Sequence, residues 1–297
     1  MTNTIEKFCV MLLAVGLMVA VASADETRWQ SVADALGKSG TELPGGVYRV
    51  GLPRTDLHVT LDGIDLKPAL ALGSWLAFAA TGKSSMVMGD LVLTEDEINP
   101  VMKKLAEGGI EITALHNHLL RARPLIFYMH ITGHDEPVVL AHSLHDALML
   151  SKTPLGPAPA ARDTPQIDLD TVMIDRVLGA KGRITAGVYQ ISIPRAEPVH
   201  EGSMTIPAAM GLAEAINFQP TGGGKTAITG DFVLTAKEVN PVLRTLREHD
   251  IEVTALHNHM LDEQPRLFFM HFWANDDAEK LARSLRAALD VINIVKR

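Results

Sequence analysis

Alternating apolar and polar positions divide most of the chain into short strands joined by tight turns. Residues 58–66 alternate around Asp62-Gly63, a strong β-hairpin signal. Residues 74–80 and 85–93 are predicted as a second hairpin, and residues 110–118 and 125–132 as a third pair of strands. A helix is predicted to follow over residues 136–150. Strands joined as hairpins, with few helices, indicate an antiparallel sheet.

Two helix starts carry the same signature. Thr94-x-x-Glu97 and Thr235-x-x-Glu238 are capping boxes, in which the two side chains bond each other's backbone N–H groups. Asn-Pro follows at 99–100 and at 240–241. Each helix therefore either bends at the proline or begins there, with asparagine as its cap.

The pattern is an internal duplication with an offset of 141 residues. Residues 113–118 and 254–259 both read Thr-Ala-Leu-His-Asn-His, and residues 89–135 and 230–276 agree at 25 of 47 positions. Residues 151–165 carry four prolines among small residues, which is typical of a linker. We therefore predict an α+β protein of two homologous tandem domains, residues 25–150 and 166–297. Each would be a mainly antiparallel sheet with two or three helices, and the pair would pack with pseudo-twofold symmetry.

The first 24 residues resemble a secretory signal peptide. An apolar run follows Lys7, and Ala22-Ser23-Ala24 offers a small-x-small cleavage site. Glu6 weakens the positive start, so an uncleaved membrane anchor is the alternative. The only cysteine, Cys9, lies inside this run, so the mature chain has no thiol for a disulfide or a metal. These features predict a periplasmic or extracellular protein.

Charge excludes one class of partner. The net charge is −8 and no basic stripe interrupts it, which is a poor match to a nucleic-acid backbone. The letters His-Asn-His suggest a nuclease only by spelling, because the residues named in that nuclease motif are not contiguous. No nucleic acid is expected as a partner, and membrane contact is expected only through an uncleaved signal segment.

Six of the twelve histidines occupy matched positions in the two copies: His116, His118 and His130, and His257, His259 and His271. Side chains alternate along a strand, so His116 and His118 share one face, about 6.6 Å apart. A hairpin register in which paired numbers sum to 246 puts His130 opposite His116 on that face. A slip of one residue would send His130 to the other face.

Three histidines on neighbouring strands predict a metal site in each copy. With an open fourth position they would suit zinc first and copper second. Asp90 and Asp231, or Glu97 and Glu238, are candidates for an added carboxylate, and Glu97 and Glu238 for a general base. The sequence leaves open a metal-binding protein or a hydrolase or lyase that uses metal-bound water.

The alternative is a non-catalytic binding or assembly module. In that interpretation the histidines are buried hydrogen-bond hubs that tie the copies together. A groove between the copies would then bind a small molecule, glycan or peptide. Copies of a structural motif would retain the histidines as well as copies of a functional one, so the duplication favours neither interpretation decisively.

Several shared stretches resemble one family. They are Gly-Val-Tyr, Gly-Asp-Leu-Val-Leu-Thr, Thr-Ala-Leu-His-Asn-His and Phe-Tyr-Met-His, and together they resemble the LppY/LpqO-like family of exported bacterial proteins. The resemblance covers nearly the whole mature chain. Some members resemble lipoproteins, whereas this chain has no cysteine at its cleavage site. The family is one of unknown function, so the resemblance implies no catalytic residues.

Overall fold

The computed structural model describes residues 27–156 and 167–296. The predicted signal peptide, residues 1–24, lies outside the described residues, as does most of the predicted linker. Each repeat builds one six-stranded antiparallel sheet. The predicted fold class, two similar repeats with mainly antiparallel sheets and helices, is confirmed.

The first repeat begins with a helix at residues 27–36. Its sheet has the order β1 (Thr41–Leu43), β2 (Val47–Pro53), β5 (Gly73–Thr81), β6 (Ser84–Leu93), β8 (Phe127–Asp135) and β7 (Glu111–His116). The small hairpin predicted around Asp62-Gly63 forms from β3 (Thr60–Leu61) and β4 (Ile64–Asp65). Its helices are α2 (Pro68–Ala71), α3 (Glu95–Glu107) and α4 (Pro137–Leu148).

The second repeat copies this plan. Its sheet has the order β15 (Glu252–His257), β16 (Leu267–Asp277), β14 (Lys225–Thr235), β13 (Ala213–Gly222), β10 (Val188–Pro194) and β9 (Arg183–Thr185). The small hairpin is β11 (His200–Glu201) and β12 (Met204–Thr205), followed by the 3-10 turn η1 (Ala208–Met210). The helices are α5 (Thr171–Leu178), α6 (Ala236–Glu248) and α7 (Ala278–Leu289). Both predicted capping boxes form, and each helix begins before its Asn-Pro pair and keeps the proline inside.

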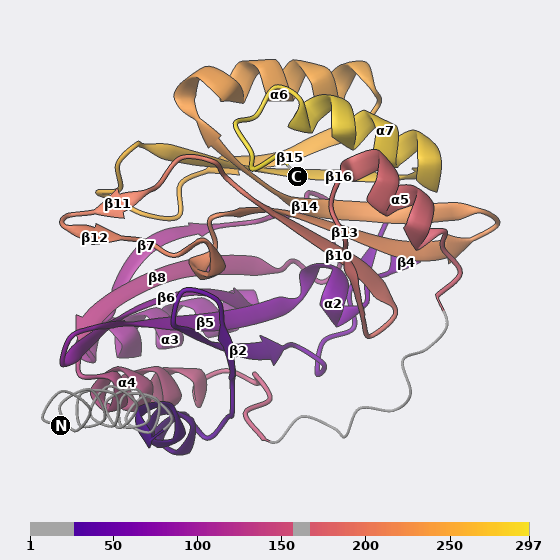
Figure 1. Cartoon of the computed structure of the whole chain (residues 1–297). Coiled ribbons are helices and arrows are strands. Elements are labelled where there is room, and N and C mark those ends of the chain that lie inside the picture. Colours follow the sequence, from indigo (N-terminus) through magenta and orange to yellow (C-terminus); the bar gives the residue numbers. More distant parts are fainter. Residues whose placement is uncertain (1–26, 157–166, 297) are drawn as a thin grey trace, which may run out of the picture.

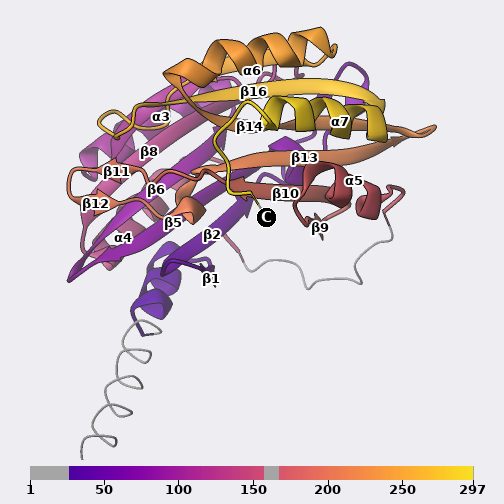
Figure 2. The ribbon, with the colours of Figure 1, turned by 45° about the horizontal axis from the view of Figure 1, so that its top comes forward.

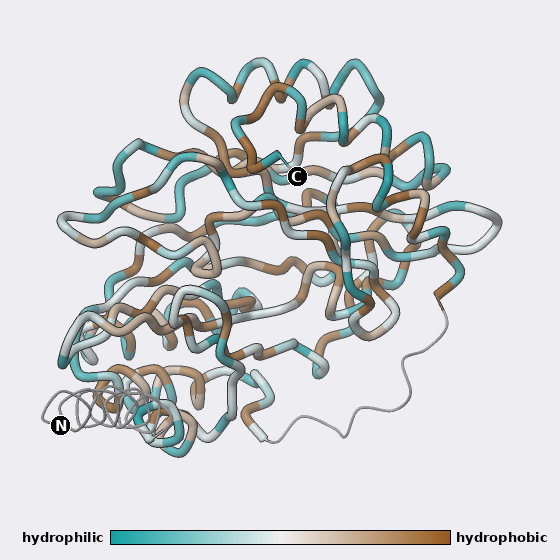
Figure 3. The backbone as a smooth tube through the Cα atoms, viewed as in Figure 1, coloured by the Kyte–Doolittle hydropathy of each residue, from teal (hydrophilic) through white to brown (hydrophobic). Residues whose placement is uncertain are grey.

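The two sheets lie face to face between outer layers of helices (Figures 1 and 2). Helices α3 and α4 cover the outer face of the first sheet, and α5, α6 and α7 that of the second. Buried apolar side chains from helix and sheet make a separate core for each repeat. In Figure 3 the outward turns of α6 are hydrophilic, as expected for helices that bury one face.

Each repeat extends an arm over the inner face of the other sheet. In the first repeat residues 59–72, the first arm, pack on Val188, Ala227 and Trp273 of the second. In the second repeat residues 199–212, the second arm, pack on inner-face residues of the first repeat that include Val47 and Ala77. The sheets are thus held together by two shared apolar clusters, and the polar centre described next lies on the same inner faces.

No helix within the described residues is both long and apolar enough to cross a membrane.

Candidate metal centre between the repeats

The local fold places three histidines of the first repeat on one face. His130 on β8 lies opposite Ala114 on β7, and His116 lies opposite Tyr128. Paired numbers therefore sum to 244 and not to the predicted 246, with an irregularity between Ile112 and Ala114. The parity is unchanged, so His130 shares the inner face with His116. Strand β7 ends at His116, and His118 follows in the connecting loop rather than in the predicted strand.

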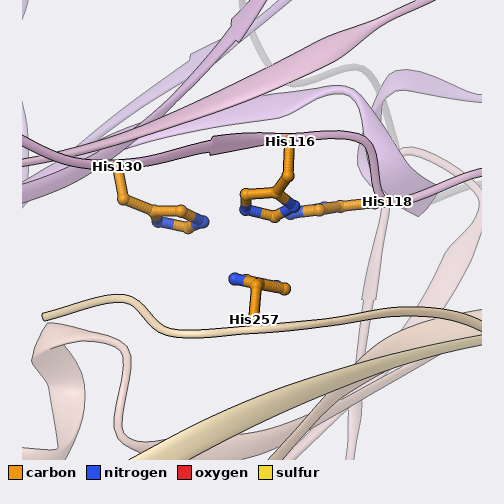
Figure 4. Close-up of side chains that lie close together, drawn as sticks. All are labelled: His116, His118, His130 and His257. Atoms are coloured by element: carbon orange, nitrogen blue, oxygen red, sulfur yellow. The ribbon is translucent and has the colours of Figure 1, made fainter.

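The predicted convergence of each triplet is confirmed. His116, His118, His130 and His257 each offer a nitrogen, and these nitrogens all lie within 4.8 Å of one another. His257, His259 and His271 form a second such group. His257 belongs to both groups, so the two triplets adjoin in one histidine centre between the sheets, and the predicted metal site in each repeat stays a prediction. Figure 4 shows the first triplet facing His257 of the other repeat.

The two triplets stack ring on ring. The ring centres are 3.5 Å apart for His116 and His257, 3.6 Å for His118 and His271, and 3.8 Å for His130 and His259. Replacing each histidine by its counterpart in the other repeat turns the second pair into the third and leaves the first pair unchanged. A pseudo-twofold axis therefore passes between His116 and His257. Tyr128 stacks on the far side of His118, and Phe269 on the far side of His259, each at 3.4 Å.

Backbone carbonyl groups fix the orientation of several rings. Nδ1 of His116 contacts the carbonyl of Asn117 at 3.3 Å, and Nδ1 of His257 contacts that of Asn258 at 3.1 Å. Nδ1 of His271 lies 2.8 Å from the carbonyl of Gly230. A carbonyl accepts only from a protonated nitrogen, so Nδ1 carries the proton and Nε2 is left with a free lone pair. Metal-binding histidines are held in the same way.

All six Nε2 atoms are buried without a hydrogen-bond partner among the described residues. Burial lowers the pKa of His116 to about 4 and that of His257 to about 3, against a raising effect of their backbone contacts. The pKa values of the other four are lowered well below the ordinary value, first by burial and then by neighbouring histidines. The imidazoles are therefore neutral at pH 7, the form that binds metal ions.

Two aspartates lie beside the histidines. Asp90 on β6 pairs with His130 on β8, and Asp231 on β14 pairs with His271 on β16. Asp231 places its oxygens 3.5 Å from Nε2 of His259 and 3.7 Å from Nε2 of His271. Burial raises the pKa of Asp90 to about 8, although the charge of Arg49 lowers it. Burial, and then the charge of Asp90, raise the pKa of Asp231. The signal for both was the shared Gly-Asp, aligned with the third histidine across the sheet.

Glu97 and Glu238, predicted as general bases, lie outside the histidine groups and form ion pairs with arginines. Glu97 accepts hydrogen bonds from Arg54 at 2.8 Å and from the backbone N–H of Thr94 and of Lys152. Burial raises the pKa of Glu97, but these hydrogen bonds lower it by more, so the pKa lies below the ordinary value. Glu238 makes the equivalent bonds with Arg195, Thr235 and Asn293. Neither glutamate is part of a histidine group.

Comparison with known proteins places the duplication in a family. The family described as Domain of Unknown Function (DUF1259) matches twice, over residues 30–150 and 172–291. The chain belongs to this family. The matches coincide with the two repeats, while the resemblance to the LppY/LpqO-like family stays a prediction. No curated protein matches the chain.

Two solved structures align along most of the chain. One is a trimeric bacterial microcompartment shell protein, PduB, with 14% identity, a TM-score of 0.23, and coverage of 88% of this chain and 97% of the other. The second is EtuB from Clostridium kluyveri, with 10% identity, a TM-score of 0.21, and coverage of 86% and 90%. TM-scores this low carry no argument about this protein.

Proposed function

We propose that this protein binds transition-metal ions, with one site on each histidine triplet. The observation that supports this proposal is the set of six buried Nε2 atoms that have no hydrogen-bond partner in the described part of the chain. A buried polar atom without a partner costs about 1–3 kcal/mol, and native proteins contain few of them. Six in one place, each on a neutral imidazole, are explained together if metal ions accept their lone pairs.

The size of the first triplet fits a metal ion. The ring centres of His116, His118 and His130 are separated by 4.9, 5.0 and 6.1 Å. A point equidistant from them lies about 3.1 Å from each, and a ring nitrogen lies about 1.1 Å from its ring centre, which leaves about 2.0 Å, the length of a zinc–nitrogen bond. In Figure 4 the far end of the His130 ring points toward His116 and His257.

The second triplet has matching dimensions. The ring centre of His257 lies 5.0 Å from that of His259 and 5.0 Å from that of His271. An all-imidazole set suits zinc, our first choice, and copper, our second. A hydrolase or lyase that uses metal-bound water is the catalytic form of this proposal. We also propose an exported, periplasmic or extracellular location, which is supported by the sequence of residues 1–24 and by the resemblance to exported proteins.

Metal analysis of the mature protein, purified without an affinity tag, tests the proposal. After incubation with zinc and desalting at neutral pH we expect two equivalents of zinc per chain. His116→Leu should reduce this content, whereas His142→Leu, a change at an exposed histidine on α4, should leave it unchanged. Less than a tenth of an equivalent of zinc or copper would overturn the proposal.

The binding or assembly module remains the second candidate, and one observation favours it. Thr113 donates a hydrogen bond to the carbonyl of His259 at 2.5 Å, and Asn258 donates to the carbonyl of Thr113 at 3.2 Å. The segments that carry the histidines thus also join the repeats. A melting temperature that does not respond to chelator or to added zinc would favour this candidate.

A further inference from the structure

We propose that Asp90 and Asp231 are metal ligands and that the two sites form one dinuclear centre. This inference rests on the proposed function and adds the ligands and the ion pairing that it leaves open. Each aspartate is paired across the sheet with the third histidine of its triplet. Both lie on the inner face, and in both Oδ1 is buried without a hydrogen-bond partner among residues 27–156 and 167–296.

The distances around Asp231 are those of ligands that share an ion. Its oxygens lie 3.5 Å from Nε2 of His259 and 3.7 Å from Nε2 of His271. Hydrogen bonds between nitrogen and oxygen are shorter, at about 2.7–3.2 Å. Two ligands on one tetrahedral ion with bonds of about 2.0–2.1 Å lie about 3.3 Å apart. The carboxylate therefore lies next to the nitrogens of His259 and His271 without a hydrogen bond to either, close enough to share an ion with them after a small shift.

Pseudo-symmetry extends the argument to Asp90. It lies opposite His130 in the register in which Asp231 lies opposite His271. Two divalent ions in a buried site need compensating negative charge, which neutral histidines do not supply. The two carboxylates are the acidic groups paired directly with the triplets, and their buried oxygens have no other partner in the described chain.

The separation of the triplets sets the distance between the ions. Matched rings of the two triplets are 3.5 to 3.8 Å apart. An ion in the plane of each triplet would place the pair at about that separation, and two-metal centres have ions about 3.5–4 Å apart. A single ion midway between the layers would lie about 2.7 Å from each nitrogen, too far for a zinc–nitrogen bond.

Copper(II) titration followed by electron paramagnetic resonance tests the pairing. Two ions at this distance couple magnetically, so we expect the integrated signal at two bound equivalents to fall well below two spins. Two full, uncoupled spins, or saturation at one equivalent, would overturn the dinuclear centre and leave metal binding itself intact. No bound copper and no bound zinc would instead defeat the proposed function.

Substitution of the aspartates tests their role. In Asp231→Asn and Asp90→Asn we expect zinc affinity at one site to fall at least tenfold, with Asp231→Glu restoring part of it. Glu214→Gln is the matched control, because Glu214 is a fully buried carboxyl of the same repeat that bonds the backbone of Val233. Circular dichroism verifies folding of each variant. Unchanged zinc affinity in folded Asp231→Asn and Asp90→Asn would show that neither is a ligand.

Discussion

The histidine centre and the arginine–glutamate pairs are both buried, polar and duplicated, yet they differ in one respect. Arg54 donates to Asp56, to Glu97 and to the carbonyl of Val92, and Glu97 also accepts from the backbone. In the second copy Arg195 makes the corresponding bonds. Nε of Arg195 is the single buried atom of these two networks that has no hydrogen-bond partner in the described chain. In the histidine centre every Nε2 lacks one.

The comparison shows why duplication alone does not identify a site. The histidines and the arginine–glutamate pairs are both retained in the two copies, so retention alone does not distinguish a structural role from a binding role. Completed hydrogen bonds mark a group that stabilises the fold as it stands. Incomplete ones mark a group arranged for something that the chain itself does not supply.

The largest expected difference is in the response to pH of the metal-free protein. The six histidines have folded pKa values below the ordinary 6.5, so the unfolded chain binds more protons as the pH falls below about 6.5. Each can then remove up to about 1.4 kcal/mol of stability per pH unit. Asp90, whose pKa is raised to about 8, acts in the opposite sense and destabilises as the pH rises toward 8, and Asp231, whose pKa is also raised, acts in the same direction.

Six histidines outnumber the four carboxyl groups with raised pKa values, which are Asp90, Asp231, Glu201 and Glu214. We therefore expect stability to be greatest near pH 6.5 and to fall by about 2–3 kcal/mol per pH unit below it. The arginine pairs behave differently: the lowered pKa of Glu97 gives stability that is present above about 4.3 and lost only below it. Urea unfolding of the metal-free protein between pH 4.5 and 8 measures the profile. Constant stability between pH 6.5 and 4.5 would mean that the histidines are not neutral and buried.

Removal of Arg54 is the next largest test. Arg54→Met leaves the Glu97 carboxylate buried without its partner, and we expect a loss of about 3–5 kcal/mol in the free energy of unfolding. Zinc content of the folded variant should not change, because the pair is separate from the histidine groups. Lys103→Met, which removes an exposed pair with Glu107, is the control and should cost less than about 1 kcal/mol. Loss of zinc from folded Arg54→Met would show that zinc binding in the histidine centre depends on the Arg54–Glu97 pair.

Chelation should affect only the histidine centre. A ligand that binds the native state at a hundred times its dissociation constant stabilises it by about 2.7 kcal/mol. We expect chelator to lower the free energy of unfolding of zinc-loaded protein by about that amount. The difference should shrink in His116→Leu and persist in His142→Leu. Equal chelator effects in the two variants would count against His116 as a ligand.

The sequence predicted which histidines form each triplet, but it did not predict that the two triplets stack on each other. Alternation along β7 and β8 fixes the face that His116 and His130 share, because parity survives a shift of two residues. The shift is set in the connecting loop, because the pair nearest the loop, His116 and Tyr128, already sums to 244. The irregularity between Ile112 and Ala114 changes only the pairs beyond it. Stacking of His116 on His257 depends on how two sheets pack across a long linker, and sequence periodicity carries no information on that.

The smallest expected effect concerns an exposed contact between the repeats. Arg121 binds Asp62 of its own repeat and Glu252 of the other, with distances of 2.9 and 2.7 Å, and all three side chains are at least 32% exposed. Solvent screens such pairs, so Arg121→Ala should cost no more than about 1 kcal/mol, less at high salt, with zinc content unchanged. Urea unfolding at low and high salt measures this. We expect the association of the repeats to depend mainly on the two shared apolar clusters and the histidine centre. A loss of several kcal/mol in Arg121→Ala would show instead that the surface charges hold the repeats together.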